Sequence, residues 1–181
     1  FNKPLSEARG IIDRWYKPMP KVKEFINSQR RNAIKGEPCT TLTGRSRHFI
    51  LTNENYNHVQ NEYINTPIQS LASDLTMLSL LEIQKYLNCE QNRHYGARIV
   101  MTVHDSIILE MPDEPKLIQE LADACIQIMG EVPHKYIPGL KVPFVADADW
   151  GYKWGELTKI GSDEPVAEDG PDEAGEYETI E

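Results

Sequence analysis

The strongest constraint on the fold of this 181-residue chain lies in residues 98–111, where two β-rich runs are separated only by His104 and Asp105. Val, Ile, Thr and Met dominate both runs, and β-branched residues favour strands. Since two polar residues between such runs leave room only for a tight turn, the segment predicts an antiparallel hairpin with His104-Asp105 at its tip. The chain is therefore expected to contain a small antiparallel sheet.

Helical segments surround this hairpin. Apolar residues recur at three- and four-residue steps over residues 4–16, 21–34, 66–87 and 113–129, which predicts four amphipathic helices. In the second helix Val22, Phe25 and Ile26 are expected to face inward. A further short strand is expected over residues 142–146, followed by Trp150 and Trp154 closing the end of the core. The predicted class is α+β, a small antiparallel sheet with flanking helices.

The start of the helix over residues 66–87 has two interpretations. Thr66 can act as the N-cap, with Pro67 at the first helical position and Gln69 completing a capping box. Alternatively, one long helix begins near Glu54, with Asn53 as its cap, and is kinked by Pro67.

A second hairpin is predicted over residues 40–50, with Gly44 supplying the turn. Arg45 and Arg47 alternate along a strand and are therefore expected on one face. Two neighbouring guanidinium groups repel each other unless an anion lies between them. A nucleic-acid phosphate and an internal carboxylate both satisfy this requirement.

The net charge of −9 is unevenly distributed. Residues 161–181 contain nine acidic and no basic residues, whereas the preceding 160 residues contain 19 of each. The acidic tail is also poor in large apolar residues, so it is expected to be disordered. A neutral body can still present a local basic face to DNA.

Other compositional features limit the possible functions. No apolar run approaches the roughly 20 residues of a membrane helix, and no secretory leader is visible. Three dispersed cysteines show no zinc spacing and are expected as single buried thiols. The chain begins at Phe1, which suggests a processed product, a split gene or a cut fragment.

Two groups of residues suggest chemistry. Asp105 at a rigid hairpin tip can ligate a hard cation such as Mg²⁺, although Asp and His also occur as simple turn residues. On a continuous helix, Asn65 and Gln69 share one face, and their amides suit the acceptors of a DNA minor groove. If Thr66 caps the helix instead, these amides belong to the cap.

The order of these motifs resembles the C-terminal third of family A (polymerase I-type) DNA polymerases, particularly phage-type members. The resemblance rests on residues 41–47, on residues 65–69 with 72–74, and on residues 103–105, and it spans roughly residues 1–157. It implies part of a right-hand polymerase fold. Fingers-side helices and a hairpin would occupy residues 1–64, the palm residues 65–160, and the acidic tail residues 161–181.

The resemblance implies template-directed transfer of deoxynucleotides to a primer 3′-hydroxyl by two-metal catalysis with Mg²⁺. Asp105 matches one of two metal-binding aspartates, and His104 matches a residue near the primer terminus. Asn65 and Gln69 match minor-groove amides, whereas Arg45 and Arg47 match a segment assigned to the template or primer backbone. The implied partners are primer-template DNA and dNTPs.

Two positions depart from the family pattern. Ser106 replaces a frequent Glu, and Asn61 replaces an Arg. The second aspartate lies outside the chain, so we expect inactivity without the missing N-terminal polymerase segment, supplied by the same or another chain. The expected location is the cytoplasm, that of the host for a phage protein.

Two competing functions remain. The chain can be a non-catalytic DNA-binding subunit of a split polymerase. HD-type phosphohydrolases also contain a His-Asp pair, but they place it on a helix among further His and Asp ligands.

Overall fold

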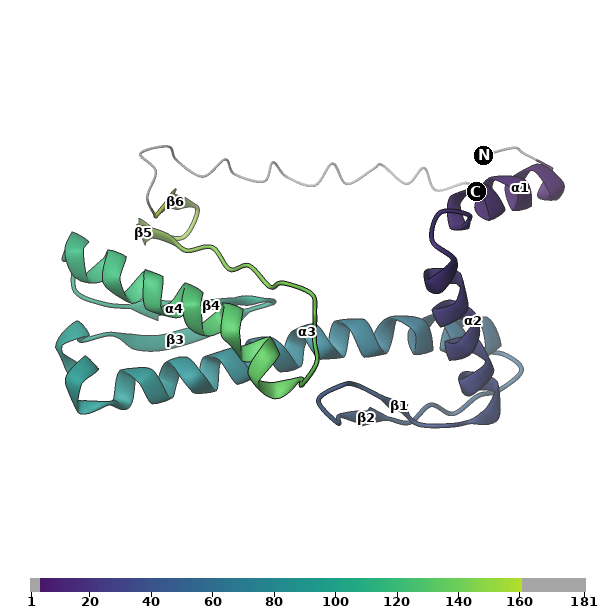
Figure 1. Ribbon diagram of the computed structural model, residues 1–181, viewed down its shortest axis with the longest axis horizontal. Helices are drawn as coiled ribbons and strands as arrows, with labels where there is room; N and C mark the ends of the chain where they lie inside the picture. Colours follow the sequence, from purple (N-terminus) through teal and green to yellow (C-terminus); the bar gives the residue numbers. More distant parts are fainter. Residues whose placement is uncertain (1–3, 161–181) are drawn as a thin grey trace, which may run out of the picture. The chain divides into compact units, whose positions relative to one another are not determined.

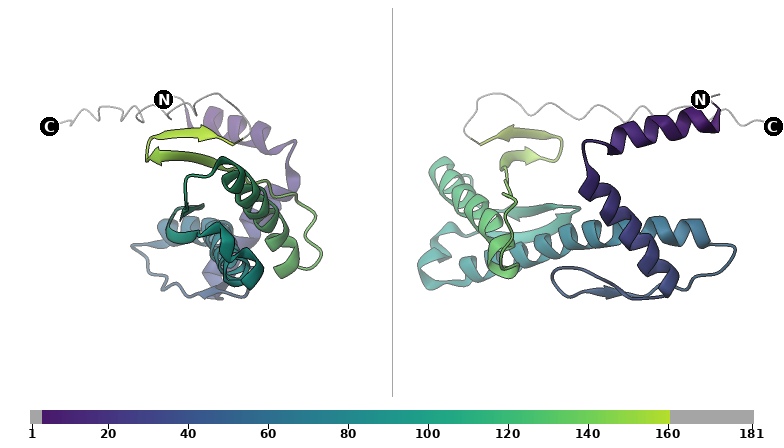
Figure 2. Two further views of the ribbon diagram at one scale, coloured as in Figure 1. Left: turned by 90° about the vertical axis from the view of Figure 1, so that its left-hand side faces the viewer. Right: turned by 45° about the vertical axis from the view of Figure 1, so that its right-hand side comes forward.

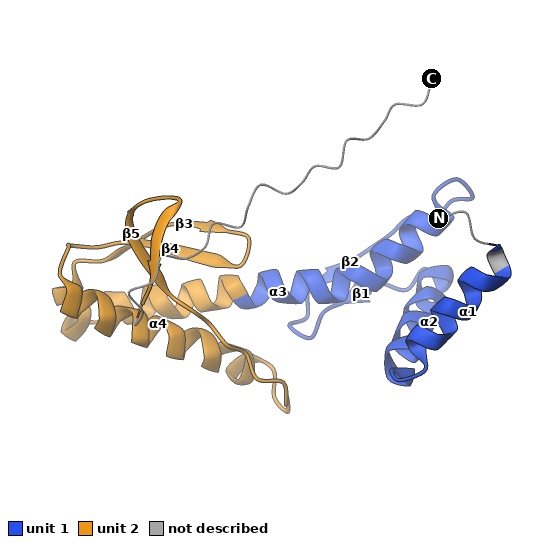
Figure 3. Ribbon diagram, turned by 90° about the horizontal axis from the view of Figure 1, so that it is seen from above, with its two compact units in different colours: residues 1–75 blue, residues 76–181 orange. Residues whose placement is uncertain are grey.

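The computed structural model describes residues 4–160, and the chain divides into two compact units, Phe1–Leu75 and Thr76–Glu181 (Figures 1 and 3). The helix α3 (Tyr56–Asn88) contributes its first part to one unit and its second part to the other. The acidic segment predicted to be disordered, residues 161–181, lies outside the described residues.

The first unit begins with α1 (Leu5–Tyr16) and α2 (Pro20–Lys35), which confirms both N-terminal helices. Gly36 ends α2 with a left-handed φ of 71°, a conformation that glycine adopts without steric cost. The inward position predicted for Val22 was wrong, because its side chain is exposed. The buried face of α2 is centred on Ala33 near the other end of the helix, where it packs in a small cluster.

The strands β1 (Cys39–Thr40) and β2 (Ser46–Arg47) pair antiparallel and confirm the first predicted hairpin. Gly44 has a φ of 92° in the connecting turn. That value explains why glycine is needed there, since a Cβ atom would be strained at this φ.

The helix α3 is continuous from Tyr56 to Asn88. The capping box at Thr66 was therefore wrong, and the single long helix is correct. Asn53 is not the cap: the backbone N–H of Thr52 donates to Asn55 Oδ1 at 2.7 Å, and the N–H of Asn55 donates to Thr52 Oγ1 at 3.3 Å. This reciprocal pair precedes the first helical turn.

Pro67 lies inside α3 and cannot donate a hydrogen bond to the carbonyl of Tyr63, four residues earlier. The thiol of Cys39 donates to that carbonyl instead, with an Sγ–O distance of 3.7 Å. Burial raises the pKa of Cys39, which keeps the thiol protonated and able to donate. The cluster of Ala33, Cys39 and Tyr63 thus compensates for the proline while forming an apolar core.

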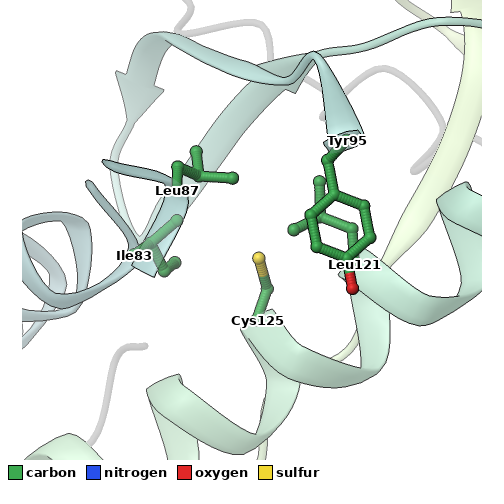
Figure 4. Close-up of a cluster of buried hydrophobic side chains, with 5 residues drawn as sticks. All are labelled: Ile83, Leu87, Tyr95, Leu121 and Cys125. Carbon is green, nitrogen blue, oxygen red and sulfur yellow. The ribbon is translucent and has the colours of Figure 1, made fainter. Parts of the chain in front are cut away.

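The core of the second unit is shown in Figure 4. Ile83 and Leu87 of α3 meet Leu121 and Cys125 of α4 and Tyr95 of the short helix η1. The η1 helix spans Glu90–Tyr95, and α4 spans Pro115–Tyr136. The helix predicted over residues 113–129 is confirmed, but it begins at Pro115 and continues past Pro133 to Tyr136.

The central hairpin is confirmed as β3 (Arg98–Val103) paired antiparallel with β4 (Ser106–Glu110). Its half-buried residues Ile99, Ile107 and Leu109 pack against the core of the second unit. The α+β class is therefore confirmed.

The strand predicted over residues 142–146 was wrong. Pro143 cannot donate a ladder hydrogen bond, and Val145 is 87% exposed. The next strands, β5 (Asp149–Lys153) and β6 (Glu156–Lys159), pair with each other. Within the described residues the strands form three separate two-stranded sheets, and Figure 2 shows the β5–β6 hairpin in yellow-green apart from β3–β4.

Two smaller predictions also require correction. Trp154 is 70% exposed and does not close the core, because it lies at the turn between β5 and β6. Cys39 and Cys125 are buried free thiols as expected, but Cys89 is exposed.

Among residues 4–160, none of the helices has both the length and the apolar composition for crossing a membrane.

Glu82 joins the two helices of the second unit. Its carboxylate accepts hydrogen bonds from Lys135 at 2.6 Å, Lys85 at 2.7 Å and the hydroxyl of Tyr136 at 2.8 Å. The hydrogen bonds from Lys135, Lys85 and Tyr136 lower the pKa of Glu82 to about 2. The carboxylate therefore stabilises the contact between α3 and α4 in its charged form.

We predict that Glu82→Gln lowers the unfolding temperature at neutral pH and that this loss shrinks as the pH falls from about 4.5 towards 2. A depressed folded-state pKa contributes stability above the unfolded pKa, and the contribution disappears as the folded carboxylate is protonated. Circular dichroism melts at several pH values measure the effect. Glu120→Gln, which removes an exposed pair with Lys116, is the control. An equal loss at pH 2.5 and pH 7 would contradict the assignment.

A double-mutant cycle tests the compensation for Pro67. In the wild-type background, Cys39→Ala leaves the Tyr63 carbonyl without a hydrogen-bond partner. In the Pro67→Ala background, the new backbone N–H of residue 67 pairs with that carbonyl. We therefore expect Cys39→Ala to lower the free energy of unfolding by about 1 kcal/mol more in the wild-type background. Urea denaturation measures the coupling. Cys125→Ala, at a buried thiol of the other core, is the control and should lower the free energy of unfolding equally in both backgrounds. An equal loss of free energy in both backgrounds for Cys39→Ala would refute the compensation.

Candidate nucleic-acid and metal site

The β3–β4 hairpin places His104 and Asp105 in a two-residue loop, flanked by the paired residues Val103 and Ser106. His104 has a φ of 52°, the only positive value of a non-glycine residue within the described range. Such a conformation costs about 1–2 kcal/mol, so the strand pairing must hold the loop in place. The tip is consequently a defined turn that presents two exposed polar side chains.

Asp105 has the properties of an available cation ligand. Its side chain is exposed, and within residues 4–160 it takes part in no hydrogen bond or ion pair. No group of three or more His, Cys, Asp or Glu residues gathers in the described part of the chain to hold a metal ion. One carboxylate fits part of a Mg²⁺ site, since this ion uses one or two carboxylates together with water and phosphate oxygens.

Asn65 and Gln69 are both exposed on α3, one turn apart. Asn61 and Ser73 extend this row by one turn in each direction and are exposed as well. Their side chains make no hydrogen bonds within the described residues. The continuous helix therefore presents a solvent-facing row of three amides and one hydroxyl, here called the amide row. This arrangement was expected only if Pro67 did not break the helix.

The two arginines have separate acidic partners in the first unit. The guanidinium of Arg45 pairs with Asp74, and that of Arg47 lies 2.8 Å from Glu62. Since these carboxylates are twelve positions apart on α3, they are separated by about 18 Å along the helix axis. The internal-carboxylate interpretation is thus confirmed, although both arginine side chains remain about half exposed.

Asp74 is the centre of a buried polar network. Its carboxylate accepts hydrogen bonds from Thr43 Oγ1 and from Thr41 Oγ1 and pairs with Arg45, and only 9% of its side chain is exposed. Thr41 Oγ1 also accepts a hydrogen bond from the backbone N–H of Arg45 at 3.1 Å. The network ties the turn around Gly44 to α3.

Sequence reasoning missed the roles of Thr41, Thr43 and Asp74. The signal was present, because a pair of neighbouring arginines requires an anion and Asp74 stands in one of the motifs. What the sequence could not show is which of the chain's many carboxylates would reach the hairpin.

Arg47 lies in a second network. Its guanidinium donates to Glu62 and, at 3.3 Å, to Thr66 Oγ1, and it stacks over Phe49 with 4.5 Å from Cζ to the ring centroid. The Oε2 atom of Glu62 also lies 3.6 Å from Nε2 of His58. Arg47 therefore holds the second strand of the hairpin to α3 while exposing one side to solvent.

Comparison with known proteins places these features in context. The sequence profile described as DNA polymerase family A matches residues 2–156. "DNA polymerase I A, chloroplastic/mitochondrial" of Arabidopsis thaliana is 33% identical over 150 residues, which is 82% of this chain and 14% of that protein.

Two further relatives have a similar sequence identity to this chain. DNA polymerase I of Geobacillus stearothermophilus is 30% identical over 158 residues, 85% of this chain and 17% of the relative. The DNA polymerase of Bacillus phage SP01 is 29% identical over 155 residues, 83% of this chain and 16% of the relative. The chain thus spans about one sixth of the length of these relatives.

We predict that Asp74→Asn destabilises the first unit by about 2 kcal/mol, because removing the charge leaves Arg45 unpaired and weakens buried hydrogen bonds to the carboxylate. Hydrogen exchange should accelerate most in residues 39–47. Ser73→Ala, at the exposed neighbouring position, is the matched control. Unchanged exchange in the hairpin of Asp74→Asn would show that the network does not hold it.

Proposed function

Because this chain belongs to DNA polymerase family A, we propose that it forms the C-terminal part of a polymerase domain that transfers deoxynucleotides to a primer 3′-hydroxyl. The observation that carries the proposal is the exposed His104-Asp105 tip of a strand pair, in a chain whose family match covers almost all described residues. The substrates would be primer-template DNA and dNTPs.

In this proposal Asp105 holds one side of a two-Mg²⁺ site. When bound, the metal ions would activate the attacking hydroxyl and stabilise the leaving pyrophosphate. The protein contributes a carboxylate on a turn whose backbone is held by the pairing of β3 with β4. His104, next to it, would contact the primer terminus.

We propose that Asn65 and Gln69 contact the minor groove of the new duplex. An amide both donates and accepts, so it can follow the acceptors that every base pair presents there. The exposure of both side chains and their lack of partners in the described chain support this role.

Arg45 and Arg47 are proposed to contact the template or primer backbone. Each guanidinium is oriented by a carboxylate on α3 but keeps about half of its surface accessible. A phosphate can therefore bind the free edge without breaking the internal ion pair.

The second aspartate of the metal pair would come from the polymerase segment that precedes this region, on the same or another chain. We therefore expect the 181-residue chain to bind DNA without extending a primer. The cytoplasm is the proposed location, within a host cell if the protein comes from a phage. A phage DNA polymerase is among its relatives.

The alternative is a non-catalytic DNA-binding subunit of a split polymerase. It is favoured by the single carboxylate at the hairpin tip, since no acidic or histidine cluster gathers among residues 4–160. The amide row would then be the functional surface, and Asp105 would be dispensable.

A chimera distinguishes these functions. The corresponding segment of the Geobacillus stearothermophilus polymerase is replaced by this chain, and primer extension with Mg²⁺ is measured. Catalysis predicts extension that is lost in Asp105→Asn and retained in Asp123→Asn, an exposed acid on α4. Asn65→Ala and Gln69→Ala should each weaken duplex binding about five- to tenfold, corresponding to roughly 1 kcal/mol.

The outcomes separate the two candidates. Extension by the chimera that survives Asp105→Asn would exclude the metal-ligand role. A chimera that binds duplex through the amides but never extends supports the DNA-binding subunit. Strong extension by the purified 181-residue chain would refute the expected dependence on a missing segment.

A further inference from the structure

The acidic segment that follows the last strand lies outside the family match, which ends at residue 156. Residues 161–181 contain nine acidic and no basic residues. The proposed polymerase activity gives this segment no role. Since opposite charges attract, a strongly anionic stretch associates with a part of the protein that carries an excess of cations.

That excess lies at the other end of the sequence. Residues 1–36 contain nine basic and three acidic residues, whereas residues 37–160 contain ten basic and sixteen acidic residues. The longer region is therefore anionic, like the acidic segment, and repels it on average. Of the two regions, only residues 1–36 have a net charge of the opposite sign.

An open cleft of about 800 Å³ lies between α1 and α2, within the first unit. Its charged lining residues are Arg14, Lys17, Lys23 and Arg31, with Asp13 and Glu24. Cations thus outnumber carboxylates two to one. The volume is within the range of ordinary ligand sites, roughly 300–1,000 Å³, so the cleft accommodates several residues of an anionic peptide.

Three of the four cations have no carboxylate partner in the part of the chain that the structure describes. Lys23 is paired with Asp13 at 2.8 Å. The side chains of Lys17 and Arg31 take part in no ion pair or hydrogen bond within residues 4–160. Arg14 donates through its Nε to a backbone carbonyl, which leaves its charge uncompensated. An anion in the cleft would relieve the repulsion among these cations.

The cations of α2 are spaced to meet more than one carboxylate of a single peptide. Lys23 and Arg31 are eight positions apart and share one helix face, about 12 Å apart along the helix axis. About four extended residues cover that length. In residues 163–181 neighbouring acidic residues are never more than four positions apart, so one peptide of this sequence can pair with both cations.

We propose that residues 161–181 bind the α1–α2 cleft of their own chain and cover it in the free protein. Lys17 and Arg31 are the principal contacts, because their charges are otherwise unpaired. The contact is autoinhibitory towards anionic ligands, since a polyanion that approaches the cleft must first displace the segment. The inference goes beyond the proposed polymerase activity and does not depend on it.

Tethering makes this contact effective although each ion pair is weak. An exposed ion pair contributes little by itself. Two sites on one chain meet at an effective concentration on the order of 1 mM. A dissociation constant of about 0.5 mM then covers the cleft about two thirds of the time. Since the ion pairs are exposed to solvent, salt is expected to weaken the contact.

Amine labelling of the full 181-residue chain, followed by mass spectrometry, tests the contact at Lys17. One variant neutralises four acids of the segment by Asp172→Asn, Glu173→Gln, Glu176→Gln and Glu178→Gln. At about 50 mM salt, Lys17 should be labelled about threefold faster in this variant than in the wild type. Salt near 1 M should remove that difference. Lys116 on α4, whose side chain is 88% exposed, should keep its rate.

A matched variant controls for net charge. It neutralises four exposed acids of the other region by Glu54→Gln, Glu90→Gln, Asp123→Asn and Glu131→Gln. Both variants change the net charge equally, so a general electrostatic effect would accelerate the labelling of Lys17 equally in both. The proposal expects acceleration only in the segment variant. Equal acceleration, or none in either variant, would overturn it.

Carbodiimide cross-linking, which joins a lysine amine to a nearby carboxylate, identifies the occupant of the cleft. We expect cross-links from Lys17 to residues 163–181 within one chain, and Lys17→Gln should remove them. A mixture of isotopically labelled and unlabelled chains separates links within a chain from links between chains. Links that occur only between chains, or links from Lys17 to acids of residues 37–160 instead, would contradict the proposal.

Discussion

One backbone carbonyl of α3 receives its hydrogen bond from outside the helix. Pro67 deprives the carbonyl of Tyr63 of its helical partner, and the thiol of Cys39 supplies a substitute from the neighbouring hairpin. The amide row and the carboxylates that bind Arg45 and Arg47 all lie on this helix. A break at residue 67 would turn Asn65 away from Gln69 and divide the row.

Local sequence signals were sufficient for the elements that have strong periodicity or turn chemistry. The hairpin around His104-Asp105, the turn at Gly44 and the helices of both units follow from such signals. The prediction of a strand over residues 142–146 was wrong because it considered only the local pattern. The apolar residues of this segment satisfy a strand pattern, but pairing requires a neighbouring strand, and Pro143 weakens the ladder.

The local surroundings of the candidate site residues were predictable from the sequence, but their contacts only partly. Sequence reasoning identified the exposed tip and the amides, because their residue types and spacing carry chemical meaning. It left open whether an anion or a carboxylate faces the arginines, since that depends on contacts between residues that are distant in the sequence: Arg45 and Asp74 are 29 positions apart, and Arg47 and Glu62 are 15 positions apart. Asp74 and Glu62 became visible only once the hairpin was placed on α3.

The β3–β4 pair has a consequence for the behaviour of the chain as a molecule. Within residues 4–160 no third strand pairs with it, so both outer edges carry backbone donors and acceptors without ladder partners. Val100 and Met101 of β3 are also half exposed. Open edges with apolar side chains recruit other strands, so in the laboratory this ribbon is the part of the chain most prone to self-association.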